Sequence, residues 1–380
     1  MTKKVSHRQL SSLIKILYYN PDKTGRKKPL LVTASFGVGK SVTIEDTAKE
    51  LAKERGKTYL NWNEISYEEK IKIIENNLFK DYFILFDIRL SAYDATDLRG
   101  LPNFVKRWVE WKYPLFVEIL QHPESDGIIF FDEFNLGTPL VLSSCYQIFH
   151  DKVISDIKIN YNWMIIGAGN KADDYANTID TPAPLKDRCA EVELTPATPK
   201  DWCSWATKNG VHPKIVAYIS WKGTMLRKVN FESNEKYTDE RAWASLSSYM
   251  KLPLEEIKLV SGTIIGEGVA SEFMGFLEIQ NIIDLDEVIK KPEILKTITE
   301  AGQKYFVISG LAEKYGNDLM TIEQLFAVST VLYENKSADF VAMLWRLASR
   351  MNKAKFRKDF TTKELKNPLR GIFAKYLIDE

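Results

Sequence analysis

The sequence has few of the residues that build disulfide frameworks or zinc sites. It contains only three cysteines, Cys145, Cys189 and Cys203, and four histidines in 380 residues. An odd number of cysteines at these spacings matches neither a disulfide scaffold nor a metal motif. The scarcity excludes a disulfide-stapled protein, argues against a zinc site and favours a reducing, cytoplasmic setting.

Long apolar runs are also missing from the sequence. No uncharged apolar stretch approaches the roughly 18 residues that a membrane span needs. Residues 1–20 lack the apolar core of a signal peptide and instead show the spacing of a short amphipathic helix. We therefore expect a soluble protein with no membrane partner.

Neither sign of charge is in excess. Lys and Arg number 52 against 51 Asp and Glu, which leaves a net charge of +1. A protein that coats nucleic acid normally has a basic excess, so nucleic acid is the less favoured partner. Residues 346–358 do hold six basic residues and no acidic one. A solvated helix face explains this run better than a contact with nucleic acid or a partner.

One short stretch of the sequence carries the pattern of a phosphate-binding loop. Residues 34–41, ASFGVGKS, follow an apolar run and precede a helical pattern that ends at Gly56. Strand, loop and helix in this order are the context that such a loop requires. The pattern calls for glycine at its first position, where this chain has Ala34. By itself the stretch is also compatible with a glycine-rich turn that happens to contain Lys-Ser.

The loop residues predict how a nucleotide is held. Glycines let backbone N–H groups turn toward phosphates, Lys40 would reach the β- and γ-phosphates of ATP, and the Ser41 hydroxyl would bind Mg²⁺. The residues expected to contact the cofactor are Gly37, Val38, Gly39, Lys40, Ser41 and Val42.

Polar residues that flank three later apolar runs predict the rest of a catalytic site. In GIIFFDEFN, Asp132 would hold Mg²⁺ and Glu133 would polarise the attacking water. Asn170 follows the run at 162–169 and could reach the γ-phosphate, although asparagine is also common in turns. Arg188 precedes the run at 190–194, where it would stabilise a transferring phosphoryl group or form a surface salt bridge.

The apolar runs also predict the fold class and the domains. Buried strands are expected at 30–33, 82–90, 127–132, 162–169 and 190–194, with helical patterns between several of them. This order predicts an α/β fold with a mostly parallel sheet. After the proline-rich stretch at 194–200 the pattern becomes helical. We predict a nucleotide domain with an N-terminal helix at 1–197 and helical domains at 198–290 and 291–380.

Taken in order, these motifs resemble an AAA+ ATPase. The stretches 86–102, 201–222 and 261–277 are similar to the MoxR-type branch, particularly to versions carried by bacteriophages. The resemblance covers residues 28 to 290. It implies a P-loop AAA+ domain, an all-helical lid at 198–290 and a helical C-terminal extension at 291–380. It also implies that residues 151–162 form a hairpin inserted before the strand that leads to Asn170.

The resemblance assigns roles to individual residues. Arg188 matches an arginine finger that acts on the neighbouring subunit, and Asn170 matches the sensor-1 residue. Arg241 matches the sensor-2 arginine, which reaches the nucleotide from the lid. This chain departs from the family in having Glu240 where proline is more usual, and Arg227 is the alternative sensor-2 residue.

The stretch at 94–102 matches the place where AAA+ rings present loops that grip a substrate. The candidates there are Leu98, Arg99 and Leu101. A structural turn is an equally good explanation of the same residues. We expect the nearby aromatic residues to belong to the core or to an interface: Trp108, Trp111 and Tyr113.

The function that the resemblance implies is ATP hydrolysis at the subunit interfaces of a ring, most often a hexamer, that remodels partner proteins. The implied cofactors are ATP and Mg²⁺. A partner with a VWA domain is expected by analogy, and a phage-encoded version would act in the bacterial host cytoplasm. Two alternatives remain open: an AAA+ loader or initiator that acts on nucleic acid, and a nucleotide-binding scaffold with little turnover.

Overall fold

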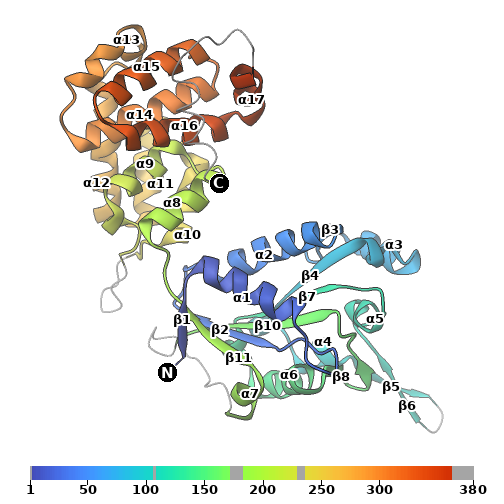
Figure 1. Cartoon of the computed structure of the whole chain (residues 1–380). Coiled ribbons are helices and arrows are strands. Elements are labelled where there is room, and N and C mark those ends of the chain that lie inside the picture. The colour runs from blue at the N-terminus through green and yellow to red at the C-terminus, as the bar shows by residue number, and fades with distance from the viewer. Residues whose placement is uncertain (1, 106–107, 172–182, 229–235, 362–380) are drawn as a thin grey trace. The chain divides into compact units, whose positions relative to one another are not determined.

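The computed structural model describes residues 2–105, 108–171, 183–228 and 236–361. The chain divides into two compact units, Met1–Pro196 and Ala197–Glu380 (Figure 1). Residues 362–380 of the expected C-terminal extension lie outside the described residues.

The first unit is built on a seven-stranded sheet in which every pair of neighbours is parallel. The strands in spatial order are β1 (Lys3–Val5), β11 (Ala190–Leu194), β2 (Leu30–Ala34), β10 (Trp163–Asn170), β7 (Gly127–Asp132), β4 (Tyr82–Arg89) and β3 (Thr58–Asn61). The expected parallel sheet is confirmed, and all five predicted strands are present. The two edge strands, β1 and β3, were not predicted, since each is short and lacks an apolar run.

Helices cover both faces of this sheet (Figure 1). α1 (His7–Tyr19) and α2 (Lys40–Glu54) share one core with alternate strand residues such as Ile128 and Phe130. Ile129 and Phe131 point to the other core. That second core is covered by α3 (Tyr67–Glu75), α5 (Leu115–Gln121) and α6 (Pro139–Asp151). Side chains of a strand alternate between faces, so a strand covered on both sides is apolar throughout.

Two antiparallel hairpins stand outside the main sheet. β8 (Val153–Ile154) pairs with β9 (Ile157–Lys158), which confirms the hairpin expected at 151–162. The other hairpin, β5 (Leu101–Val105) with β6 (Trp108–Lys112), was not predicted.

The structure around the second hairpin corrects one of the sequence predictions and narrows another. Leu98 lies in α4 (Ala95–Arg99) and is only 1% exposed, so it packs in the core and cannot grip a substrate. Trp108 and Trp111 are 59% and 38% exposed, so neither is a core residue. The core is therefore excluded for these two residues and the interface stays a prediction, because the strands of this hairpin pair only with each other and have little protein to pack against.

The second unit is entirely helical apart from one isolated bridge in its described part. Its longer helices are α8 (Pro199–Lys208), α9 (Pro213–Trp221), α11 (Leu254–Ile265), α12 (Glu267–Leu277), α14 (Ala301–Gly316), α15 (Ile322–Glu334), α16 (Ala338–Met351) and α17 (Lys353–Thr361). One continuous core runs from Trp202 to Phe356, and α14 packs against both α9 and α16. A division of this unit near residue 290 stays a prediction.

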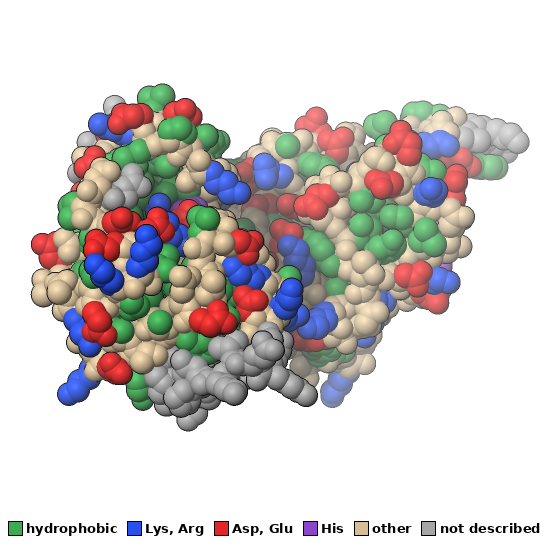
Figure 2. All heavy atoms as spheres, turned by 90° about the horizontal axis from the view of Figure 1, so that it is seen from above, with side chains coloured by type: hydrophobic (Ala, Val, Ile, Leu, Met, Phe, Trp, Pro, Cys, Tyr) green, Lys and Arg blue, Asp and Glu red, His purple; other side chains and the backbone are tan. Residues whose placement is uncertain are grey.

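Charges of both signs are interspersed over the face of the molecule shown in Figure 2. Within the basic run at 346–358, Lys355 is engaged by the protein itself. Its Nζ lies 2.9 Å from Asp318 and donates to the Tyr315 carbonyl at 2.8 Å. None of the helices in the described ranges is long and apolar enough to cross a bilayer.

Candidate functional site

The predicted phosphate loop lies where the order of the sheet reverses. It joins β2 to α2, and β2 lies between β11 and β10, strands that come much later in the chain. Parallel strands end at the same edge of a sheet, and α/β proteins bind ligands at such a reversal. The loop is therefore bordered by the ends of the strands that carry the other candidate residues.

The conformation of the loop explains both its glycines and its alanine. Gly37 and Gly39 have φ of 70° and 92°, in the left-handed region that strains other residues. Ala34 is the last residue of β2, pairs with Asn170 in the sheet and is fully buried. Because its φ is not positive, this first position of the loop does not require glycine.

Lys40, the first residue of α2, connects the ends of two strands. Its Nζ donates to Asn170 Oδ1 at 2.9 Å, to the Ala34 carbonyl at 3.1 Å and to the Ser35 carbonyl at 3.2 Å. An ammonium group has three donors and is here surrounded by oxygen acceptors. The same donors would suit phosphate oxygens placed over the loop.

Ser41 and Asp132 form the second link across the site. The Ser41 hydroxyl donates to Asp132 Oδ2 at 2.8 Å, and the Asp132 side chain is almost fully buried. A hydroxyl and a carboxylate are hard oxygen ligands, and Mg²⁺ in nucleotide sites takes one or two such groups in addition to phosphates and water. This donor set therefore fits Mg²⁺ bound together with a nucleotide.

Glu133 has an unusual backbone conformation, and its carboxylate is engaged by a neighbouring strand end. It follows β7 with φ of 53°, and its N–H donates to Asp132 Oδ1 at 2.8 Å. Its carboxylate accepts a hydrogen bond from the Ser91 hydroxyl. Sequence reasoning missed Ser91, although its position just past the end of β4 could have revealed it, since β4 lies beside β7.

Asn135 anchors Asn170 and was also missed. Its side-chain amide donates to the Asn170 carbonyl at 2.7 Å and accepts from the Asn170 N–H at 3.0 Å. Asn135 is buried, so both of its bonds replace water. This two-way contact fixes the strand end from which the Asn170 side chain reaches Lys40.

The acidic character of the site is strengthened by Asp87 on β4. Burial raises the pKa of Asp87 to about 6, and the nearby Asp132 carboxylate adds to the rise. Its Oδ1 has no hydrogen-bond partner among the described residues. Two carboxylates that repel each other in this way favour a bound cation near them.

The N-terminal helix also contacts the loop. His7 Nε2 donates to the Val38 carbonyl at 2.7 Å, which ties the start of α1 to the middle of the loop. No signal in the sequence pointed to this residue, because 31 positions separate the partners.

The structure therefore brings together five predicted residues: Lys40, Ser41, Asp132, Glu133 and Asn170. Arg188 ends α7 (Ala183–Arg188) at an exposed position. Val42, in the first turn of α2, is 42% exposed.

The two candidate sensor-2 residues belong to the helical unit. Arg241 lies in α10 (Glu240–Leu246) and is exposed. Arg227 Nη1 pairs with Glu240 Oε2 at 2.8 Å, so the charges of these two residues offset each other within the unit. This engagement leaves Arg241 as the more available of the two.

No family model matches the chain, and no curated protein matches it. Among solved structures, it is similar to Cdc6p from Pyrobaculum aerophilum, with 13% identity, 89% of this chain and 93% of that chain covered, and a TM-score of 0.40. It is also similar to the Aeropyrum pernix ORC2 protein in ADPNP–ADP complexes, with 12% identity, 91% and 87% coverage and a TM-score of 0.36. A third is a mutant of Thermotoga maritima RuvB, with 13% identity, 87% and 83% coverage and a TM-score of 0.33. These three proteins are P-loop AAA+ ATPases.

Proposed function

We propose that this chain is an AAA+ ATPase of the MoxR type that hydrolyses ATP at the subunit interfaces of a ring and remodels partner proteins. The observation that carries the proposal is the pair of links Lys40–Asn170 and Ser41–Asp132, at 2.9 and 2.8 Å. They join the loop to the ends of β10 and β7, the two strands that follow β2 in the sheet.

Each residue has a distinct task in this proposal. Lys40 and the N–H groups of the loop bind the phosphates, while Ser41 and Asp132 hold Mg²⁺. Bound Mg²⁺ supplies positive charge that offsets the charge developing on the phosphates. Glu133 orients and polarises the attacking water once its carboxylate leaves Ser91.

The ring is supported by the exposure of Arg188. A guanidinium at the surface is available to the nucleotide of a neighbouring subunit, where fingers of this kind contribute about 10³–10⁵ in rate. A hexamer, a protein client, a VWA-domain partner and the cytoplasm of a phage-infected host are the finer parts of the proposal and rest on the family resemblance. Arg241 is proposed to reach the nucleotide from the helical unit.

Mixing two inactive variants tests the shared site. Glu133→Gln should bind ATP normally and hydrolyse it on the order of 10²-fold more slowly, since the base is lost. Arg188→Ala should abolish hydrolysis and spare ATP affinity. A mixture should recover part of the activity, because some Glu133→Gln subunits lend their arginine to neighbours that keep Glu133. ATPase rates are measured after subunit exchange has been verified by energy transfer between separately labelled subunits.

Two controls keep the test interpretable. Lys40→Ala should weaken ATP binding itself, whereas Lys186→Ala, an exposed cation on the same helix as Arg188, should leave the rate unchanged. Mixtures as inactive as either variant alone would exclude a finger acting between subunits. Full turnover by Glu133→Gln would overturn the assignment of the catalytic base.

A further inference from the structure

One peptide group of the phosphate loop is held by a side chain from outside the loop. His7, the first residue of α1, has its Nε2 atom 2.7 Å from the Val38 carbonyl oxygen. A carbonyl only accepts hydrogen bonds, so Nε2 carries the proton and the neutral ring keeps its lone pair on Nδ1. α1 also packs against α2, the helix that follows the loop (Figure 1).

The peptide between Val38 and Gly39 needs such a support. Gly37 and Gly39 have φ of 70° and 92°, whereas the φ of Val38 between them is not positive. Alternating signs of φ turn successive N–H groups toward one side of the backbone and make a concave anion site. Glycine adopts either sign of φ readily, so two flanking glycines give little resistance to rotation of the peptide between them. Such a rotation would remove one N–H group from the concave side.

The bond from His7 opposes this rotation. The C=O of Val38 and the N–H of Gly39 belong to one planar trans peptide and point in opposite directions. A carbonyl held toward α1 therefore directs the Gly39 N–H away from α1. The Val38 side chain is only 2% exposed and lies in the core that it shares with Leu10 of α1. The helix thus fixes Val38 through both its side chain and its carbonyl.

His7 is itself held at a defined position. The preceding Ser6 caps α1 in a capping box with Gln9, which sets where the helix begins. Val5 ends β1, and its carbonyl accepts hydrogen bonds from the Thr195 N–H at 2.9 Å and the Thr195 hydroxyl at 3.1 Å. A donor placed by a helix cap and a strand loses little further freedom when it makes its bond.

We propose that His7 is a positioning residue that locks the Val38–Gly39 peptide with its N–H directed at the phosphates of bound ATP. This role rests on the ATP site proposed above. His7 does not touch the nucleotide and acts only through the loop backbone. Without its bond, part of the population has the rotated peptide, and the apparent affinity falls in proportion to the fraction that remains competent. The loss concerns the phosphates and not the base.

Competition binding separates the contact with the phosphates from the contact with the base. Tripolyphosphate with Mg²⁺, and separately adenosine, are titrated against a fluorescent ATP analogue bound to the full chain. His7→Phe keeps a ring and removes the donor. Tripolyphosphate should then bind about fivefold more weakly, the effect of one net hydrogen bond, while adenosine binds as before. His7→Gln keeps an N–H donor on a side chain of similar length and should restore most of the affinity.

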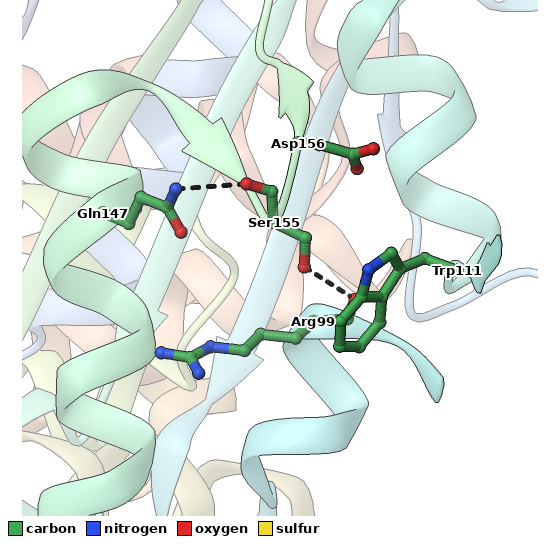
Figure 3. Close-up of a pocket in the computed structure, with 5 residues that line it drawn as sticks. All are labelled: Arg99, Trp111, Gln147, Ser155 and Asp156. Carbon is green, nitrogen blue, oxygen red and sulfur yellow. Dashed lines mark hydrogen bonds between the residues drawn. The ribbon is translucent and has the colours of Figure 1, made fainter. Parts of the chain in front are cut away.

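A matched control removes a bond of the same type elsewhere in the first unit. Gln147 borders a cavity of about 310 Å³, and its Nε2 donates to the Ser155 carbonyl at 3.1 Å (Figure 3). Gln147→Met should leave the affinities for tripolyphosphate and adenosine unchanged. Lys40→Ala should abolish the binding of tripolyphosphate, because it removes the cation of the loop.

The outcomes distinguish failure of the lock from failure of the proposed function. Tripolyphosphate binding that survives in Lys40→Ala would show that the loop is not a phosphate site, and both proposals would fall. Loss of binding in Lys40→Ala with full binding in His7→Phe would exclude the lock alone. Equal weakening of tripolyphosphate and adenosine in His7→Phe, or no recovery in His7→Gln, would also exclude the lock and leave His7 as an anchor of α1.

Discussion

Gly169 allows a sharp test of how the end of β10 is held. A Cβ at this position would lie 2.8 Å from Asn135 Oδ1 and 2.9 Å from Asn135 Cγ. The backbone of Gly169 is not in the left-handed region, so the obstacle to alanine is purely steric. Asn135 is buried and cannot move aside without giving up its two hydrogen bonds to Asn170.

The expected cost follows from these two bonds. Each contributes about 1 kcal/mol, so Gly169→Ala should lower the free energy of unfolding by about 2 kcal/mol. The displaced Asn170 should also lose its contact with Lys40. We expect ATP hydrolysis to fall about tenfold, which corresponds to about 1.4 kcal/mol.

A double-mutant cycle measures the coupling directly. In an Asn135→Ala background the new methyl group has room, so Gly169→Ala should cost close to nothing and the coupling should be about 2 kcal/mol. Urea denaturation of the four proteins gives the free energies. Gly268→Ala, on a helix with nothing within 4 Å of the new Cβ, is the control and should be stabilising by about 0.5–1 kcal/mol. The same cost in both backgrounds would refute the steric reasoning.

Two further predictions concern one partly buried carboxylate and one fully buried carboxylate. Burial raises the pKa of Asp87 to about 6, so the folded state favours the protonated carboxyl. The stability that this carboxyl contributes is therefore complete below about pH 4 and is lost as the pH rises through 6. Asp87→Asn should therefore be more stable than the parent by about 1 kcal/mol at pH 7.5, after allowance for the partial solvation of Asp87, and should show no gain at pH 4. Urea denaturation without Mg²⁺ at the two pH values measures the difference in the free energy of unfolding. An equal difference at both pH values would contradict the prediction. Asp126 is fully buried and pairs with Arg55 at 2.9 Å. Asp126→Asn should therefore lower the free energy of unfolding by about 3 kcal/mol. The control Asp81→Asn, at an exposed position, should change it by less than about 0.5 kcal/mol.

The local pattern of the sequence was sufficient for the elements of the first unit. Strands covered on both faces read as continuous apolar runs, so β2, β4, β7, β10 and β11 could be located within a residue or two. The order of these runs and the helices between them also predicted a parallel sheet. Strand-end polar residues such as Asp132 could be named because the ends of parallel strands meet at one edge.

Contacts between distant parts of the chain could not be predicted in the same way. The bonds from Asn135 to Asn170 and from Ser91 to Glu133 depend on which strands become neighbours, and the contact of His7 with Val38 depends on how α1 packs. No periodicity in the sequence encodes these pairings.

In the β5–β6 region, the sequence also could not predict which side chains are buried. The sequence by itself determined that residues 94–113 combine apolar, aromatic and charged side chains, which suits a core, an interface or a turn equally well. Only the tertiary structure decided that Leu98 is buried while Phe104 and Trp108 face outward. The physical reason is that burial depends on what lies opposite a side chain, and this hairpin extends beyond the sheet and helices that could have covered it.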